Sequence, residues 1–70
     1  MTDLPYTVIT KKLGHDAERW CTDNIGERWF AVGRRFGVWT CFWAGRDNPK
    51  YYNWHFRNEK DAVFFSLRWA

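Results

Sequence analysis

The stretch YYNWHFRNEKDAVFFSLRWA, residues 51–70, decides the fold. Residues 51–57 alternate in the pattern of a β-strand with one buried face. A polar run begins at Asn58, and apolar residues then recur with the spacing of a helical face. We therefore predict a strand followed directly by a helix. One face of the strand carries Tyr52, Trp54 and Phe56, and one face of the helix carries Ala62, Phe65 and Trp69.

Asn58 is predicted to be the N-cap of this last helix. Residues 58–61 (NEKD) approximate a capping box, with Asp61 in place of the usual Glu or Gln. In that arrangement the Asn58 side chain accepts a hydrogen bond from the N–H of Lys60 or Asp61.

Two further strands are predicted before residue 51. Residues 38–44 (VWTCFWA) are almost continuously apolar, which is typical of a central strand covered on both faces. Residues 27–36 (ERWFAVGRRF) alternate and predict another strand. Residues 45–50 (GRDNPK) place Asp, Asn and Pro in turn order and form the clearest loop in the chain.

The N-terminal part predicts one strand and one helix. Residues 6–12 (YTVITKK) are β-rich, and their lysines are typical of an exposed edge strand. His15 or Asp16 is expected to cap a helix of about ten residues. One face of that helix carries Ala17, Trp20 and Cys21, and Gly26 is expected to end it.

Together these elements predict a single α+β domain over residues 1–70. It would contain a three- or four-stranded, mostly antiparallel sheet and two helices in the order β-α-β-β-β-α. The residues expected to be mostly buried share periodic apolar faces; they are Trp20, Phe30, Val32, Phe42, Trp54, Phe65 and Trp69.

Aromatic residues are the outstanding feature of the composition. Six Trp, six Phe and three Tyr make up 21% of 70 residues. A chain this short buries only about 60% of its unfolded surface, so large rings compensate for its small core. The alternative is that some rings face outward as a binding platform.

The charges do not indicate a dedicated DNA-binding protein. The net charge is +3, and the basic pairs at residues 11–12 and 34–35 stand apart instead of forming a stripe. The N-terminus has no apolar export signal, and no apolar run is long enough to cross a membrane. We therefore expect a cytoplasmic protein in which Cys21 and Cys41 are reduced and unbridged.

Nothing in the sequence indicates an enzyme. Cys21, Cys41, His15 and His55 show no metal-ligand spacing, so neither a metal site nor a cofactor is expected. Cys41 and His55 could meet across adjacent strands, but no third group is available to orient a base. The paired acidic residues lie at helix starts, where they complement the helix dipole.

The candidate binding residues lie in and after the 45–50 loop. Loops carry function because the scaffold holds them without using their side chains in the core, and interfaces favour Arg and Tyr. An ordinary solvated turn is the alternative. The half-polar face of the following strand, which Arg35 could join, is the one surface suited to stacking nucleic-acid bases. The residues selected are Arg46, Asp47, Lys50, Tyr51, His55 and Arg57.

Three motifs resemble small uncharacterised proteins of tailed bacteriophages. They are residues 37–39 (GVW), 42–46 (FWAGR) and, above all, 56–69, with the pattern F-R-N-E-K-D-A-x-x-F-x-L-R-W. The resemblance covers roughly the C-terminal half and carries no catalytic residues. It implies a phage protein acting in the host cytoplasm.

The function expected from these observations is non-catalytic. The chain would bind and inhibit or redirect a bacterial host or defence protein, or would bind another phage protein. The alternatives are a virion or self-assembling protein, in which case it would form oligomers, and a binder of single-stranded nucleic acid.

Overall fold

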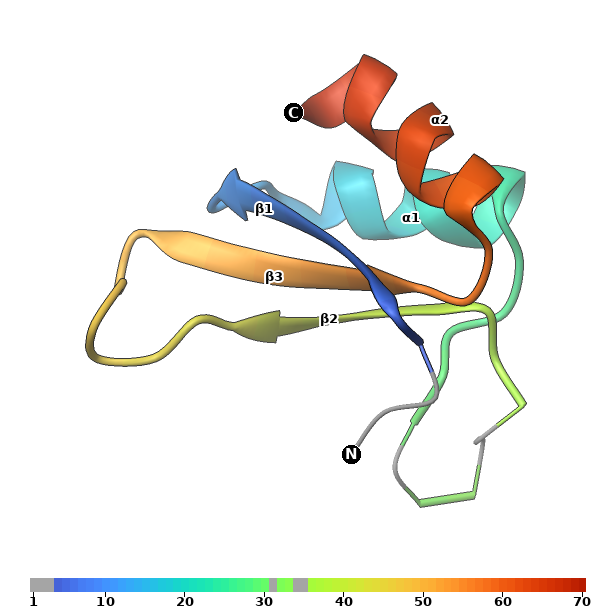
Figure 1. Cartoon of the computed structure of the whole chain (residues 1–70), viewed down its shortest axis with the longest axis horizontal. Helices are drawn as coiled ribbons and strands as arrows, with labels where there is room; N and C mark the ends of the chain where they lie inside the picture. The colour runs from blue at the N-terminus through green and yellow to red at the C-terminus, as the bar shows by residue number, and fades with distance from the viewer. Residues whose placement is uncertain (1–3, 31, 34–35) are drawn as a thin grey trace.

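The structure is a computed structural model, and it describes residues 4–30, 32–33 and 36–70. Its elements follow the order β1 (Tyr6–Lys11), α1 (His15–Asn24), β2 (Trp39–Trp43), β3 (Tyr51–Phe56) and α2 (Glu59–Trp69). Both helices lie on the same side of the sheet (Figure 1). The chain therefore has the α+β fold that its alternating and helical patterns predict.

The sheet is antiparallel, and its strand order is β1-β3-β2. Trp54 in the central strand β3 pairs with Val8 of β1 on one side and with Cys41 of β2 on the other. The edge position predicted for β1 is confirmed. The central position predicted for residues 38–44 is wrong, because β2 is the second edge. Its apolar run reflects burial at Trp39, Thr40 and Cys41, followed by exposed Phe42 and Trp43.

The core lies between the sheet and the two helices. Phe65 of α2 is at its centre, with its ring centroid 4.7 Å from that of Trp54 and 5.2 Å from that of Phe56. The Trp39 and Trp54 rings stack at 6.0 Å. The buried cluster consists of Ala17, Cys21, Trp39, Cys41, Trp54, Phe56, Ala62 and Phe65.

The predicted core is correct in part. Trp54 and Phe65 are buried, and Trp20 and Trp69 are half-buried against the cluster. Three predictions are wrong, because Phe30, Val32 and Phe42 are 42%, 89% and 44% exposed. The predicted strand that contains Phe30 and Val32 does not form over the residues that the structure describes, and Phe42 lies on the face of the sheet opposite the helices.

The predicted strand at residues 27–36 is wrong over the part of it that the structure describes. Arg28 makes one isolated parallel bridge to Trp39, and residues 32–33 form a turn. Gly33 has a φ of 86°, which departs from the extended backbone of a regular β-strand. The described residues of this connection, 25–30, 32–33 and 36–38, run instead from the end of α1 to the side of the sheet away from the helices (Figure 1).

The start of α1 differs from the prediction, whereas α2 begins after Asn58 as predicted but without the expected side-chain hydrogen bond. The N-cap of α1 is Gly14, not His15 or Asp16. Asn58 is the N-cap of α2, but its side chain does not cap the backbone. Its amide donates to Asp61 Oδ2 at 3.3 Å, while the Asn58 carbonyl accepts from the N–H of Asp61 at 3.2 Å. The expected stop at Gly26 is confirmed by its φ of 145° and its hydrogen bond to the Cys21 carbonyl.

Candidate binding surface

The sheet face opposite the helices is only partly covered. At the end where β2 begins, Thr40 is 1% exposed, and Leu4 and Trp29 are buried outside the main core cluster. Towards the β2–β3 hairpin the same face is accessible. We call this accessible part the open face; it consists of Thr7, Ile9, Lys11, Phe42, Tyr51, Asn53 and His55.

The open face combines apolar and polar side chains in cross-strand rows. Asn53 in the middle pairs with Ile9 on one side and Phe42 on the other, and these neighbours are 62% and 44% exposed. In the next row Tyr51 pairs with Lys11 and is 37% exposed. Large side chains that remain accessible beside amide and ammonium groups are typical of protein interfaces.

His55 lies at the boundary between the open face and the covered end of the sheet, where it pairs with the buried Thr40. Its Nδ1 lies 3.0 Å from Thr7 Oγ1 in a hydrogen bond, and its ring centroid is 5.8 Å from that of Phe42. Burial lowers the pKa of His55, which keeps the imidazole neutral around pH 7. The open face therefore draws its positive charge from Lys11 and not from this imidazole.

The β2–β3 loop extends beyond the open face. Gly45 has a φ of 98° and its carbonyl accepts from Asn48 N at 3.2 Å; Tyr51 N then donates to the Asn48 carbonyl at 3.1 Å. Trp43 Nε1 donates to the Pro49 carbonyl at 3.0 Å, so the backbone of the loop is held from several points. Its side chains at residues 46–50 are all exposed.

The structure separates the residues predicted to form a site into three groups. Tyr51 and His55 lie together on the open face, as their alternation predicts. Arg46, Asp47 and Lys50 lie in the adjoining loop. Arg57 lies elsewhere and has a structural contact, because its guanidinium donates to the Gly37 carbonyl at 2.9 Å. Arg35 lies outside the described residues.

Sequence reasoning selected only Tyr51 and His55 from the open face, and the two large apolar members that it missed are Ile9 and Phe42. Ile9 could have been found, because alternation in residues 6–12 places it opposite the face that carries Val8. Phe42 was assigned to the core because an unbroken apolar run does not indicate which of its residues face a helix.

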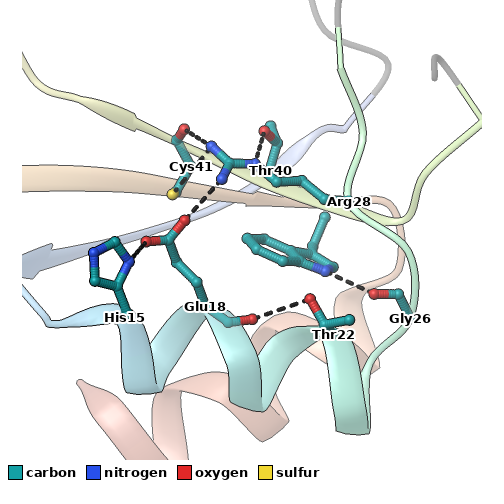
Figure 2. A network of polar contacts seen from close by, with 8 residues as sticks. His15, Glu18, Thr22, Gly26, Arg28, Thr40 and Cys41 are labelled. Atoms are coloured by element: carbon teal, nitrogen blue, oxygen red, sulfur yellow. Dashed lines mark hydrogen bonds and ion pairs between the residues drawn. The ribbon is translucent and has the colours of Figure 1, made fainter. Parts of the chain in front are cut away.

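A second cluster, around Arg28, connects α1 to β2 (Figure 2). The Arg28 guanidinium donates to Glu18 Oε1 at 2.7 Å and to the Cys41 carbonyl at 3.2 Å. It also lies over the Trp39 ring, 5.3 Å from the centroid. On the far side of Glu18, His15 Nδ1 is 3.4 Å from Oε2. Sequence reasoning gave Arg28 no role, since its partners are distant in the chain.

A cavity of about 470 Å³ lies next to this cluster. Its lining includes Lys12, His15, Glu18, Cys41 and Trp54. Burial, with smaller contributions from the neighbouring Cys41 and Glu18, raises the pKa of the Cys21 thiol to about 12, although Arg28 opposes the rise. Burial also raises the pKa of Cys41, although Arg28 opposes the rise. Both thiols are free and stay protonated at neutral pH, which makes them poor nucleophiles.

The sheet register separates the residues considered for cysteine catalysis. Cys41 pairs with Trp54 on the helix side, whereas His55 belongs to the opposite face. The two therefore cannot form a nucleophile–base pair. Among the described residues, no group of three or more His, Cys, Asp or Glu side chains could hold a metal ion.

Comparisons with protein-family models, with curated proteins and with solved structures give no match to this chain. In the described part of the chain, neither helix is long and apolar enough to span a membrane.

Proposed function

We propose that this chain is a non-catalytic protein-binding module that uses the open face and the adjoining loop. The observation that carries the proposal is the accessible row of Ile9, Asn53 and Phe42, with Tyr51 next to it. Exposed large apolar side chains on a small protein mark interaction sites when they gather on one surface. The charged loop residues Arg46, Asp47 and Lys50 would then form a polar rim.

The partner we propose is a bacterial protein. This step is supported by the resemblance of residues 56–69 to small proteins of tailed bacteriophages, which act inside bacteria. In that setting the module would inhibit or redirect a host protein in the host cytoplasm. The two thiols are buried and protonated on the opposite side of the sheet, which favours binding over cysteine catalysis at the open face.

The test is affinity capture from a bacterial lysate with three forms of the chain. They are the parent, the open-face variant Phe42→Ser/Tyr51→Ser and the control Val63→Ser/Leu67→Ser. The control residues are 53% and 83% exposed on α2, so both double variants remove accessible apolar surface. Thermal melts first establish that all three are folded.

We expect one protein to be captured in stoichiometric amounts by the parent and the control, and to be lost or reduced at least about tenfold with the open-face variant. A loss of this size corresponds to about 1.4 kcal/mol. Capture of that protein at the parental level by the folded open-face variant would contradict the proposed site.

A second candidate is binding of single-stranded nucleic acid. Phe42, His55 and Tyr51 lie on one sheet face with Lys11 beside them, and single-stranded binders stack bases on such rings. The two functions separate by salt dependence. Binding of an oligonucleotide that weakens steeply as salt rises supports this second function, whereas capture of a protein that persists in high salt supports the first.

A further inference from the structure

The two edges of the sheet differ in a way that points to a partner strand. The outer edge of β2 is occupied at two carbonyls: that of Trp39 accepts from Trp29 N at 2.6 Å, and that of Cys41 accepts from the Arg28 guanidinium. On the outer side of β1, by contrast, the backbone N–H groups donate no hydrogen bond to any residue that the structure describes. An unpaired six-residue edge is a ready template for another strand.

The register identifies which groups of β1 face outward. Lys12 N donates to the Lys50 carbonyl, so residues in phase with Lys12 bond to β3. The alternate residues Thr7, Ile9 and Lys11 therefore direct their backbone N–H and C=O groups away from the sheet. The side chains of all three are exposed, so the edge is accessible.

We propose that this edge binds the same edge of a second copy of the chain, antiparallel, with Val8 on the two-fold axis. Thr7 and Ile9 would then each exchange two hydrogen bonds with Ile9 and Thr7 of the second copy. Lys11 would lie opposite Pro5 of that copy. Two three-stranded sheets would join into one continuous sheet.

The pair between Lys11 and Pro5 supports this register. Proline has no N–H, so the carbonyl opposite it would normally lose a partner. The Lys11 carbonyl already accepts from Thr10 Oγ1 within its own chain, at 2.7 Å. The Lys11 N–H remains free to donate to the Pro5 carbonyl of the second copy. At each end of the paired strands, the missing N–H of Pro5 therefore leaves no backbone carbonyl without a hydrogen-bond donor.

Charge also favours the same register. Each Lys11 lies opposite residue 5 of the other copy, so the two ammonium groups are separated along the strands by six residues, or roughly 20 Å. That is about twice the Debye length at physiological salt, so their repulsion is largely screened. Registers that bring the two Lys11 residues opposite each other are disfavoured.

The helix layer can accommodate a second copy. α2 packs over β1 and β3, so pairing of the β1 edges would place the two α2 helices about two strand spacings, or roughly 10 Å, apart. Packed helices lie about 8–10 Å apart. Phe64 is turned towards Trp20 of α1, at 4.9 Å, and helical geometry places the small residues Ala62 and Ser66 on the opposite side of α2. Small residues permit such a close approach there, whereas the larger Trp69 lies near the end of β1, where it lines a cavity with Ile9 and Lys11.

The contacts at the β2 edge favour an assembly of two chains, because Trp29 and Arg28 already bind the Trp39 and Cys41 carbonyls there. If both edges were open, pairing would continue into a filament, whereas one open edge gives a closed two-fold dimer. This inference goes beyond the proposed function, because it uses backbone groups along the β1 edge, whereas the proposed function uses side chains of the open face, to which Thr7, Ile9 and Lys11 also belong. The two are tested separately, since the capture experiment changes Phe42 and Tyr51 and leaves β1 intact.

The first test is the mass of the full chain in solution, measured by sedimentation over a wide range of concentration. We expect the mass to rise from 8.5 kDa to twice that value. Ile9→Lys should remain a monomer, because it places a charge in the pairing. The matched control Leu67→Lys adds the same charge at an 83% exposed position and should dimerise like the parent. A mass of 8.5 kDa for the parent at every concentration, or dimers of folded Ile9→Lys, would overturn the proposal.

The second test determines the register by oxidation of single cysteine variants. In the proposed register the two Val8 Cα atoms are about 4.5 Å apart, within the range of a disulfide, whereas the two Ile9 Cα atoms are roughly 9 Å apart. Val8→Cys should therefore form a cross-linked dimer under mild oxidation and Ile9→Cys should not. The buried Cys21 and Cys41 are common to both variants and give the same background. The reverse result would overturn this register.

Discussion

Arg28 shows how one side chain can connect three parts of a small fold. Its guanidinium is bound to a carboxylate of α1, to a carbonyl at the edge of β2 and, at 3.5 Å, to the hydroxyl of Thr40. The Arg28 and Glu18 side chains are 28% and 34% exposed, so this ion pair is only partly screened by water. Removing one partner leaves the others without their hydrogen bonds.

We expect Arg28→Met to lower the free energy of unfolding by roughly 1.5–3 kcal/mol, the range for hydrogen bonds to a charged group. Methionine keeps much of the aliphatic packing against Trp39 but donates no hydrogen bond. A urea titration followed by tryptophan fluorescence measures the effect. Arg19→Met is the control, because Arg19 is exposed on α1 and its loss should cost less than about 0.5 kcal/mol. Equal midpoints for the two variants would mean that the Arg28 cluster does not stabilise the fold.

At the scale of elements, the connection between α1 and β2 differs most from the sequence-based expectation. Residues 27–36 alternate like a strand, yet in the part of this range that the structure describes the bridge to β2 is made by Arg28. Alternation reports which side chains are apolar, but a strand also needs a neighbouring edge to pair with, and glycine weakens it. Gly33 adopts a positive φ, and beyond it Gly37 packs against the backbone of the same segment.

Gly37 provides the test of this connection. A Cβ at residue 37 would overlap the backbone of Arg28 and Trp29, which cannot move aside as a flexible side chain can. We expect Gly37→Ala to destabilise the fold by at least about 3 kcal/mol, the upper part of the range for overpacking. The comparison is Gly14→Ala, where a Cβ has nothing within 4 Å and the change of N-cap should cost at most about 1 kcal/mol. Thermal melts of both variants decide whether the close approach exists.

The elements that could be predicted are those with a complete local signal. The alternation of residues 51–56 and the helical spacing at Ala62, Phe65 and Trp69 each define a buried face without reference to the rest of the chain. The same holds for Tyr51 and His55 of the candidate surface. The order of the strands and the contacts of Arg28 depend on which edges meet in three dimensions, and no local pattern contains that information.

At the scale of the whole molecule, a few rings supply most of the core of a 70-residue chain. The molecule extends over only 28 × 26 × 21 Å, and its largest fully buried side chains are Trp39, Trp54, Phe56 and Phe65. Other rings, among them Phe36, Phe42 and Trp43, are 44% to 65% exposed. Both interpretations of the aromatic composition therefore apply, since one set of rings forms the core and another forms accessible surface.

Phe65 is the position at which the dependence of the core on a few rings is most easily tested. It is fully buried, and its ring contacts Trp54 and Phe56 as well as Trp20, whose centroid is 6.1 Å away. Phe65→Ala should cost about 3–5 kcal/mol, and natural domains have only about 5–15 kcal/mol in total. The free energy of unfolding of so small a domain is expected to exceed that cost by little. We therefore expect the variant to be largely unfolded at 37 °C. Leu67→Ala, on the same helix but 83% exposed, should melt like the parent. A melt of Phe65→Ala within a few degrees of the parent would show that the core does not depend on this ring.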